Sequence, residues 1–383
     1  MPNNSNGTIN RLDIVVSNDS FSSLCEGAVS VINMVKSWKS GNIAFELFKD
    51  GITNHLVKCY LKDNPDQALL IRVYGEKTEL FIDRDLEVRN MQMMCEAGLC
   101  APLHCAFING LCYGFSPGEV LDTKMVRDPD ISKLIAGRLA KMHSVRSNVN
   151  GVVPQPCLFP MLFKYLHLIP DSFPDPVKDE RYKSLIKPKN VLEAEINSLK
   201  EELVKLESPV VFSHNDLLLK NVIYNKEKEE VTFIDYEYAD YNYQAFDIGN
   251  HFCEFAGVEK FDPKLYPDKD FQMRWLKEYL EAWYLENDKS LEDVTEEIVE
   301  DFYIQVNKFA LAAHLLWGTW GLIQSAHSTL DFDFLGHLKY KLLNILSSAF
   351  AKKYAKDRLD EYFARKDEFL SLESSQTCPD KSS

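Results

Sequence analysis

One stretch decides the fold of this chain: Val211-Phe-Ser-His-Asn-Asp-Leu-Leu-Leu-Lys-Asn221, followed closely by Val231-Thr-Phe-Ile-Asp235. It reads as a strand, a polar loop, a short strand, a turn and a last strand that ends in an acid. His214, Asp216 and Asn221 fit the spacing H-x-D-x-x-x-x-N, and the final acid stands fourteen positions after the last of them. Two adjacent strands would bring the two acids and the amide to one rim of a small sheet.

Kinase catalytic loops carry this arrangement. One carboxylate, here Asp216, receives the proton of the attacking hydroxyl, while an amide and a second acid, here Asn221 and Asp235, hold magnesium ions beside the ATP phosphates. The spacing alone is a weak signal, because Asp and Asn are also common in turns and caps. The apolar residues 210–212 and 222–224, which run straight into and out of the loop, strengthen it, so we predict a phosphoryl-transfer site.

The bulk composition bounds the class of protein. A chain of 383 residues is long enough for two lobes and a large core. The net charge of −15 argues against a nucleic-acid binder and is compatible with a cationic small substrate, although an acidic surface is the simpler interpretation. Nine cysteines with no C-x-x-C pair and no apolar N-terminal segment indicate a reduced cytoplasmic protein. The longest apolar stretch, 309–323, is too short for stable membrane insertion.

The order of predicted elements gives the fold class. Strands are expected at 43–48, 55–61, 68–74, 104–109 and 111–115, and early helices at about 23–38 and 83–95. Later helices are expected at about 130–145, 191–207, 270–286 and 295–325. We therefore predict an α+β, two-lobed protein-kinase-like fold, with a small antiparallel-sheet N-lobe and a larger, mainly helical C-lobe.

The predicted lobe limits follow from the breaks in the pattern. Ser116-Pro-Gly118 interrupts the strands, so residues 21–116 form the expected ATP-binding N-lobe and residues 117–370 the catalytic and substrate-binding C-lobe. Residues 1–20 and 371–383 are polar and rich in Asn or Ser, and we expect both tails to be disordered.

Two features of the N-lobe suggest phosphate contacts. The turn Asp50-Gly-Ile-Thr-Asn54 joins two strands, and it either covers phosphates with its backbone N–H groups or is a plain hairpin turn. Arg72 lies within an apolar strand, where a charge needs a partner, and Glu87 on the following helix is the expected one. The strand is the third of the lobe, where kinases place a phosphate-binding cation.

Aromatic and acidic residues of the C-lobe suggest a place for a cation. Trp317 and Trp320 lie three positions apart on one helix face, which favours core packing but also suits the wall of an ammonium pocket. Phe332 and the acids Glu237 and Glu254 would complete such a pocket.

Two further patterns are assigned other roles. Asp247, in Phe246-Asp-Ile-Gly249, is expected to brace the catalytic loop. Gly114-Phe-Ser-Pro-Gly118 matches the G-x-S-x-G elbow of hydrolases, but Pro117 lacks the N–H that the oxyanion hole requires, which disfavours a hydrolase function.

The chain resembles the choline/ethanolamine kinase family over about residues 40–365. The resemblance to the whole family rests on four segments: His214–Asn221, Phe233–Ala239, Tyr241–Tyr243 and Phe246–Phe252. Five others resemble the ethanolamine kinase branch in particular: 50–54, 74–79, 109–113, 254–257 and Leu330–Gly336.

The resemblance implies ATP- and magnesium-dependent phosphorylation of ethanolamine to phosphoethanolamine, the first step of the cytidine diphosphate route to phosphatidylethanolamine. It implies Asp216 as the base, Asn221 and Asp235 as metal ligands, and the following residues in the ATP site: Thr53, Asn54, Arg72, Glu87, Gly114, Phe115 and Ser116. It places these residues in the substrate pocket, beside Asp216: Glu237, Tyr238, Glu254, Trp317, Trp320 and Phe332.

Three alternatives stay open from the sequence. A choline kinase, or a kinase of both amines, would share the same chemistry, because the pocket offers both aromatic faces and carboxylates. A binding or scaffold protein without activity is disfavoured by the intact Asp216, Asn221 and Asp235. We expect a monomer or a homodimer that binds a small molecule, with no nucleic-acid partner.

Overall fold

A computed structural model of the chain describes residues 9–48, 55–75, 82–146, 153–173, 176–257, 261–327 and 354–373. The chain divides into two compact units. Unit 1 comprises residues up to 119 together with 232–238, and unit 2 comprises 120–231 and the residues from 239 onward. Among the helices so described, none has the length and apolar character that crossing a membrane requires.

Unit 1 is built on a six-stranded sheet with the order β1-β5-β6-β4-β3-β2. Its strands are β1 Arg11–Leu12, β2 Ile43–Phe48, β3 His55–Leu61, β4 Asn64–Val73, β5 Leu103–Phe107 and β6 Gly110–Gly114. Neighbouring strands are antiparallel except for β1, which runs parallel to β5. The five strands predicted for this part of the chain are confirmed, with ends shifted by up to four residues.

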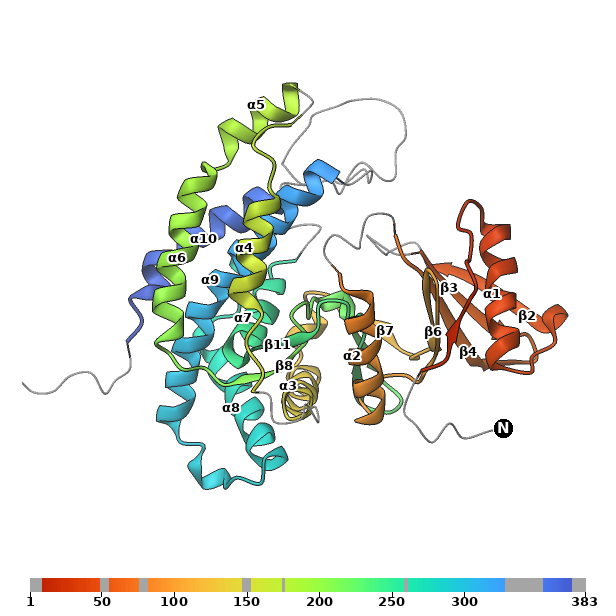
Figure 1. Cartoon of the computed structure of the whole chain (residues 1–383). Coiled ribbons are helices and arrows are strands. Elements are labelled where there is room, and N and C mark those ends of the chain that lie inside the picture. Colours follow the sequence, from red (N-terminus) through yellow and green to blue (C-terminus); the bar gives the residue numbers. More distant parts are fainter. Residues whose placement is uncertain are drawn as a thin grey trace, which may run out of the picture. The chain divides into compact units, whose positions relative to one another are not determined.

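The two faces of this sheet pack against different helices (Figure 1). Helix α1, Phe21–Val35, packs its buried residues on the face that carries Ile71 and Val73 of β4. Helix α2, Arg84–Glu96, packs Val88 and Met91 on the opposite face. Because side chains alternate along a strand, Arg72 points to the α2 face.

The start of the chain differs from the expectation. Residues 1–20 were expected to be disordered, but β1 pairs with β5, and Val16 is fully buried. Asn109 accepts a hydrogen bond from the Val16 N–H at 3.0 Å and donates one to the Val16 carbonyl at 2.8 Å. The apolar residues within 12–16 explain why this segment is ordered, although the polar composition around it is typical of a disordered tail.

The same segment sets where α1 begins. The helix begins at Phe21, earlier than expected, because Ser20 is the N-cap, and the side chains of Ser20 and Ser23 form a reciprocal capping box. The helix ends at Val35, three residues before the predicted end. Helix α2 begins after Asp83, whose carboxylate accepts the N–H groups of Asp85 and Leu86.

Unit 2 is mainly helical (Figure 1). Its helices are α3 Pro129–His143, α4 Leu158–Leu168, α5 Pro176–Leu185, α6 Lys189–Val204, α7 Gln244–Glu254, α8 Lys269–Glu286, α9 Glu296–His327 and α10 Tyr354–Leu370. Strands β8 Val210–Ser213 and β11 Asp240–Tyr243 form an antiparallel pair. Strands β7 Glu119–Val120, β9 Val222–Asn225 and β10 Glu230–Phe233 form a small sheet that extends to the boundary of the unit.

The long helix α9 packs against α4, α6, α7, α8 and α10. The predicted helices in α3, α6, α8 and α9 are confirmed, whereas α4, α5, α7 and α10 were not predicted. All eleven residues of α7 are buried, so its sequence lacks the polar face that marks an amphipathic helix.

Close packing of α7 on α9 depends on Gly249. A Cβ at this position would lie 2.6 Å from the Val306 carbonyl oxygen and 2.9 Å from the Ala310 nitrogen. Both atoms belong to the backbone of α9, which cannot turn away as a side chain can. Gly137, inside α3, has no atom within 4 Å of the corresponding Cβ position.

These two glycines give a matched test of the packing. We expect Gly249→Ala to lower the free energy of unfolding by about 1–3 kcal/mol, because the helices must move apart. Gly137→Ala should raise it by about 0.5–1 kcal/mol, since alanine favours the helix and meets nothing. Denaturant titration of both variants measures the difference, and equal effects would contradict the close α7–α9 contact.

Candidate active site

The predicted catalytic loop begins with a sharp change of backbone direction. Strand β8 ends at Ser213, and Asn215 adopts a left-handed conformation with φ 63°. Asn tolerates this region better than most residues do. His214, Asn215 and Leu217 are buried while Asp216 between them is only half-buried, so the loop leaves one carboxylate nearer to solvent.

Asp247 fixes the backbone of this loop by hydrogen bonds. Its two carboxylate oxygens accept the backbone N–H groups of His214, at 2.8 Å, and Asn215, at 2.7 Å. The predicted bracing role of Asp247 is therefore confirmed. The side chain lies on α7 and is fully buried, so these bonds replace the water that an ionised carboxylate would otherwise need.

Asp247 belongs to a network of buried polar side chains. The His143 Nε2 atom lies 2.9 Å from the Asp247 carboxylate, and its Nδ1 atom lies 2.6 Å from the Tyr279 hydroxyl. Gln244 donates to the same hydroxyl at 2.9 Å. Burial would raise the pKa of Asp247, but the hydrogen bond from His143, the electrostatic effects of His143 and His214, and the His214 backbone N–H lower it below its ordinary value.

Asn250, one turn further along α7, makes a second connection. Its amide donates to the Asn215 carbonyl at 3.0 Å and accepts the Trp317 indole N–H at 2.8 Å. Trp317 was predicted to pack in the core or to line a pocket, and it is 4% exposed and joined to the loop by this bond. The sequence predicted no role for Asn250, although it lies within Phe246–Phe252, or for His143, which belongs to no motif.

Asn221 lies at the other end of the loop. It closes the short 3-10 turn Leu219–Asn221, and its amide nitrogen donates to the Asp216 carbonyl at 2.9 Å. That bond directs the amide oxygen away from this carbonyl. Asp216 and Asn221 are thus held together by the backbone between them and by a side-chain bond.

Glu254 forms an ion pair that the sequence did not predict. Arg358 on α10 donates to its carboxylate, and both side chains are buried. Because the guanidinium neutralises the acid, Glu254 does not offer a full, uncompensated charge to a ligand. Arg358 lies on the apolar stripe formed by Ala355, Leu359 and Tyr362. A charged residue within this stripe is the sequence feature that could have indicated a buried ion pair.

Aromatic rings lie beside this ion pair. The rings of Trp317 and Trp320 meet edge to face with centroids 5.7 Å apart, and Tyr354 lies 5.9 Å from Trp320. Burial raises the pKa of Tyr354, and the carboxylates of Glu254 and Asp216 act in the same direction. The aromatic group therefore lies within electrostatic reach of Asp216.

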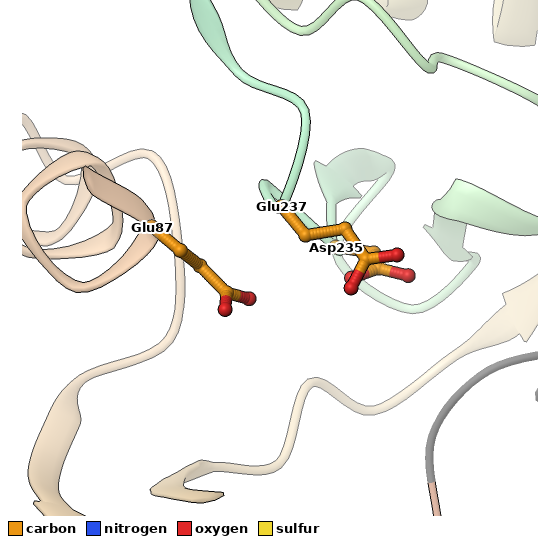
Figure 2. A group of neighbouring side chains, drawn as sticks. All are labelled: Glu87, Asp235 and Glu237. Atoms are coloured by element: carbon orange, nitrogen blue, oxygen red, sulfur yellow. The ribbon is translucent and has the colours of Figure 1, made fainter. Parts of the chain in front are cut away.

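Unit 1 contains a chain of alternating charges. Arg72 donates to Asp235 at 2.8 Å and also to Glu87, which confirms the predicted Arg72–Glu87 pair. Arg84 continues the chain, with one nitrogen 2.9 Å from Glu87 and 3.2 Å from Glu237. Glu87 comes from α2, whereas Asp235 and Glu237 come from the segment that follows β10 (Figure 2).

The oxygens of this group suit a hard cation. Glu87, Asp235 and Glu237 each offer a carboxylate oxygen, and these atoms lie within 4.8 Å of one another. Asp235 has a left-handed backbone with φ 67°, a conformation that commonly occurs where a side chain is held for function. Burial would lower the pKa of Arg72, but Tyr113, Asp235 and Glu237 raise it, so the guanidinium stays charged.

The remaining predicted residues have separate positions. Gly114 ends β6, and the next residue, Phe115, donates its N–H to Ala68 at 3.3 Å and lies under the Lys58 ammonium, 4.1 Å from its ring centre. Ser116 follows directly, half-buried, and Tyr238 is buried. Thr53, Asn54 and Phe332 lie outside the described residues.

His251 on α7 is a neutral histidine that contacts the loop. Its Nδ1 atom lies 2.8 Å from the Leu217 carbonyl, and Nε2 has no hydrogen-bond partner among the described residues. Burial lowers its pKa to about 4, while the Leu217 carbonyl and the Asp247 carboxylate oppose the shift and His214 adds to it. An unfolded histidine titrates near 6.5.

This difference predicts how stability depends on pH. Between pH 6.5 and 4 the unfolded chain binds a proton at residue 251 that the folded chain does not, so stability falls as the pH falls. We expect His251→Gln to reduce the slope of the unfolding free energy in this window by about 1.4 kcal/mol per pH unit, the value for one proton. Replacement of the exposed His167 by Gln is the control, and an unchanged slope in His251→Gln would contradict the assignment.

Comparisons with known proteins identify similar chains. The chain is 44% identical to the mouse protein named ethanolamine kinase 1 over 94% of this chain and 95% of that one. It is 45% identical to a probable ethanolamine kinase of Nematostella vectensis, over 86% and 90% of the two chains. The solved structure of Plasmodium vivax ethanolamine kinase superposes with a TM-score of 0.74 at 26% identity, covering 91% of this chain and 90% of that one.

The predicted fold class is confirmed by these structures. Choline kinase from Cryptosporidium parvum, at 21% identity, shares the fold with a TM-score of 0.70 over 90% of this chain and 96% of that one. The family model described as choline/ethanolamine kinase matches residues 45–345, which include the loop after β8 and Asp247. The chain belongs to the choline/ethanolamine kinase family.

Proposed function

We propose that this protein transfers the γ-phosphoryl group of ATP to the hydroxyl of ethanolamine, which yields phosphoethanolamine for phosphatidylethanolamine synthesis. The observation that carries the proposal is the loop in which Asp247 fixes the backbone of His214 and Asn215 and presents Asp216. The relatives named ethanolamine kinase, at 43–45% identity, favour this amine over choline.

In this mechanism Asp216 accepts the proton of the ethanolamine hydroxyl as that oxygen attacks the phosphorus. Its half-buried position, between buried neighbours, suits a carboxylate that meets substrate on one side only. The bond from Asn221 to the Asp216 carbonyl keeps the loop from rotating as the proton moves. Little covalent chemistry is required of the protein, so positioning accounts for most of the catalysis.

Asn221 and Asp235 are proposed as the magnesium ligands. Their oxygen donors fit a hard cation, and bound magnesium would neutralise charge on the ATP phosphates. Arg72, held in place by Glu87, is proposed to contact the phosphates, because its pairing with Asp235 shows that it reaches the acid that would face the metal. The residues Thr53, Asn54, Gly114, Phe115 and Ser116 are proposed to complete the ATP site.

The ammonium group is proposed to bind beside the aromatic cluster. Trp317 and Trp320, with Tyr354 next to them, offer ring faces and edges, and Glu254 offers carboxylate oxygen. Since Arg358 already neutralises Glu254, we expect the amine to be bound by short-range hydrogen bonds as much as by net charge. Glu237, Tyr238 and Phe332 remain predicted pocket residues, and the cytoplasmic location and the monomeric or homodimeric state also remain predictions.

A substrate panel tests the proposal. With ATP and magnesium, ethanolamine should have a kcat/KM at least tenfold above that of choline, with the N-methylated ethanolamines between them. Choline has no N–H donor, so acceptors in the pocket would lose partners worth about 1–3 kcal/mol each. Equal or better turnover of choline would reject ethanolamine as the preferred substrate.

Asp216→Asn is the matched control variant in that assay. It keeps the size of the side chain but removes the base, so kcat should fall about 10²–10⁴-fold while the variant still binds ATP. Turnover within threefold of wild type would show that Asp216 is not the base, but it would not affect the ranking of the substrates. The role of Asp216 and the preference for ethanolamine are therefore tested separately.

A further inference from the structure

Two cysteines face each other at the end of helix α2. Cys95 lies in the last turn of the helix, and Cys100 follows the turn at Gly98, whose backbone is left-handed with φ 70°. That turn reverses the chain, so the Cys100 sulfur lies 3.5 Å from the Met91 carbonyl. The two sulfur atoms are 3.0 Å apart, already close to the distance at which they could bond.

This pair is more exposed than four of the other cysteines in the described part of the chain. Both members are half-buried, whereas four others are buried: Cys59, Cys105, Cys112 and Cys253. Cys105 and Cys112 also lie opposite each other, on β5 and β6, but within the sheet core, where a dissolved oxidant does not reach. Cys25 and Cys157 are half-buried as well, and the Cys157 sulfur accepts a hydrogen bond from the Asn215 amide at 3.6 Å rather than facing a second thiol.

The surroundings of Cys95 favour its reactive form. A hydrogen bond from Cys100 lowers the pKa of Cys95, and the Leu103 backbone N–H, 3.3 Å away, acts in the same direction against the effect of burial. By contrast, burial raises the pKa of Cys253 to about 12. The thiolate is the nucleophilic form of cysteine, so Cys95 should react first.

We propose that Cys95 and Cys100 form a reversible dithiol modification site, which peroxide converts to an intramolecular disulfide. The Cys95 thiolate attacks one peroxide oxygen, the O–O bond breaks, and the hydroxide that leaves takes up a proton to become water. The Cys100 sulfur then attacks the resulting sulfenic acid, the S–O bond breaks, and the Cys100 proton leaves with the second water. Each sulfur loses one electron, and the two peroxide oxygens gain the two electrons.

The disulfide would join the end of α2 to the segment that leads into β5. The sulfurs need to approach by only about 1 Å to reach the bond length of about 2.05 Å. Helix α2 also carries Glu87 and Arg84 of the charge chain, so the modification would lie on the same helix as part of the active site. A small dithiol reductant would reverse it by exchange and would itself become a disulfide.

The test treats the reduced full-length chain with an equimolar amount of hydrogen peroxide and then blocks the remaining thiols. Mass spectrometry should show the loss of two hydrogens, with peptides linked between Cys95 and Cys100, and dithiothreitol should restore the thiols. Amide exchange over residues 95–103 should be slower in the oxidised chain, because the cross-link opposes local opening.

Three variants make the result decisive. Cys100→Ser should form no disulfide and should accumulate a sulfenic acid at Cys95, which dimedone traps. Cys95→Ser should react more slowly at Cys100 than wild type, and Cys25→Ser, the control, should form the disulfide as wild type does. A disulfide mapped to Cys105 and Cys112, or peroxide labelling that does not depend on Cys95, would overturn the proposal.

Discussion

The structure of unit 2 depends on one fully buried carboxylate. Asp247 accepts two consecutive backbone N–H groups from the catalytic loop and contacts His143. Burying an ionised acid costs several kcal/mol unless its oxygens are hydrogen-bonded, and here three partners fill that need. Asn215 can then keep its left-handed backbone, which places Asp216 at the surface of the loop while its neighbours stay buried.

In unit 1, charged side chains are likewise held by several partners, here side chains of opposite charge. Arg72 is held between Glu87 and Asp235, and Arg84 links Glu87 to Glu237. Three carboxylates and two guanidinium groups leave one excess negative charge, so most of the charge in this group is compensated internally. A buried charge network of this kind fixes side chains in place more strictly than apolar packing would.

Much of this could be predicted from the sequence. The strands of unit 1, the Arg72–Glu87 pair and the bracing of residues 214 and 215 by Asp247 all follow from local spacing or from a charge placed inside an apolar strand. Local spacing cannot predict partners that are distant in the chain. Arg358 lies 104 positions from Glu254, and the same separation divides His143 from Asp247.

Other errors came from composition. Helix α7 is buried on every side and contains Gly249, so it shows neither an amphipathic stripe nor a high helix propensity. The strand β1 was obscured by its polar surroundings, although Val16 anchors it in the core. The pairing of Cys95 with Cys100 was not predicted, because their spacing differs from C-x-x-C and a left-handed turn at Gly98 brings the two residues together.

The most direct test of this account is kcat for Asp247→Asn, measured on folded enzyme. Asparagine has the same shape, but its NH₂ group faces one of the two loop N–H groups, which then loses its acceptor. The lost bond, worth about 1–3 kcal/mol, should lower kcat roughly tenfold to a hundredfold if the loop geometry depends on it. A folded variant with wild-type kcat would show that the catalytic loop is positioned without Asp247 and would contradict the account.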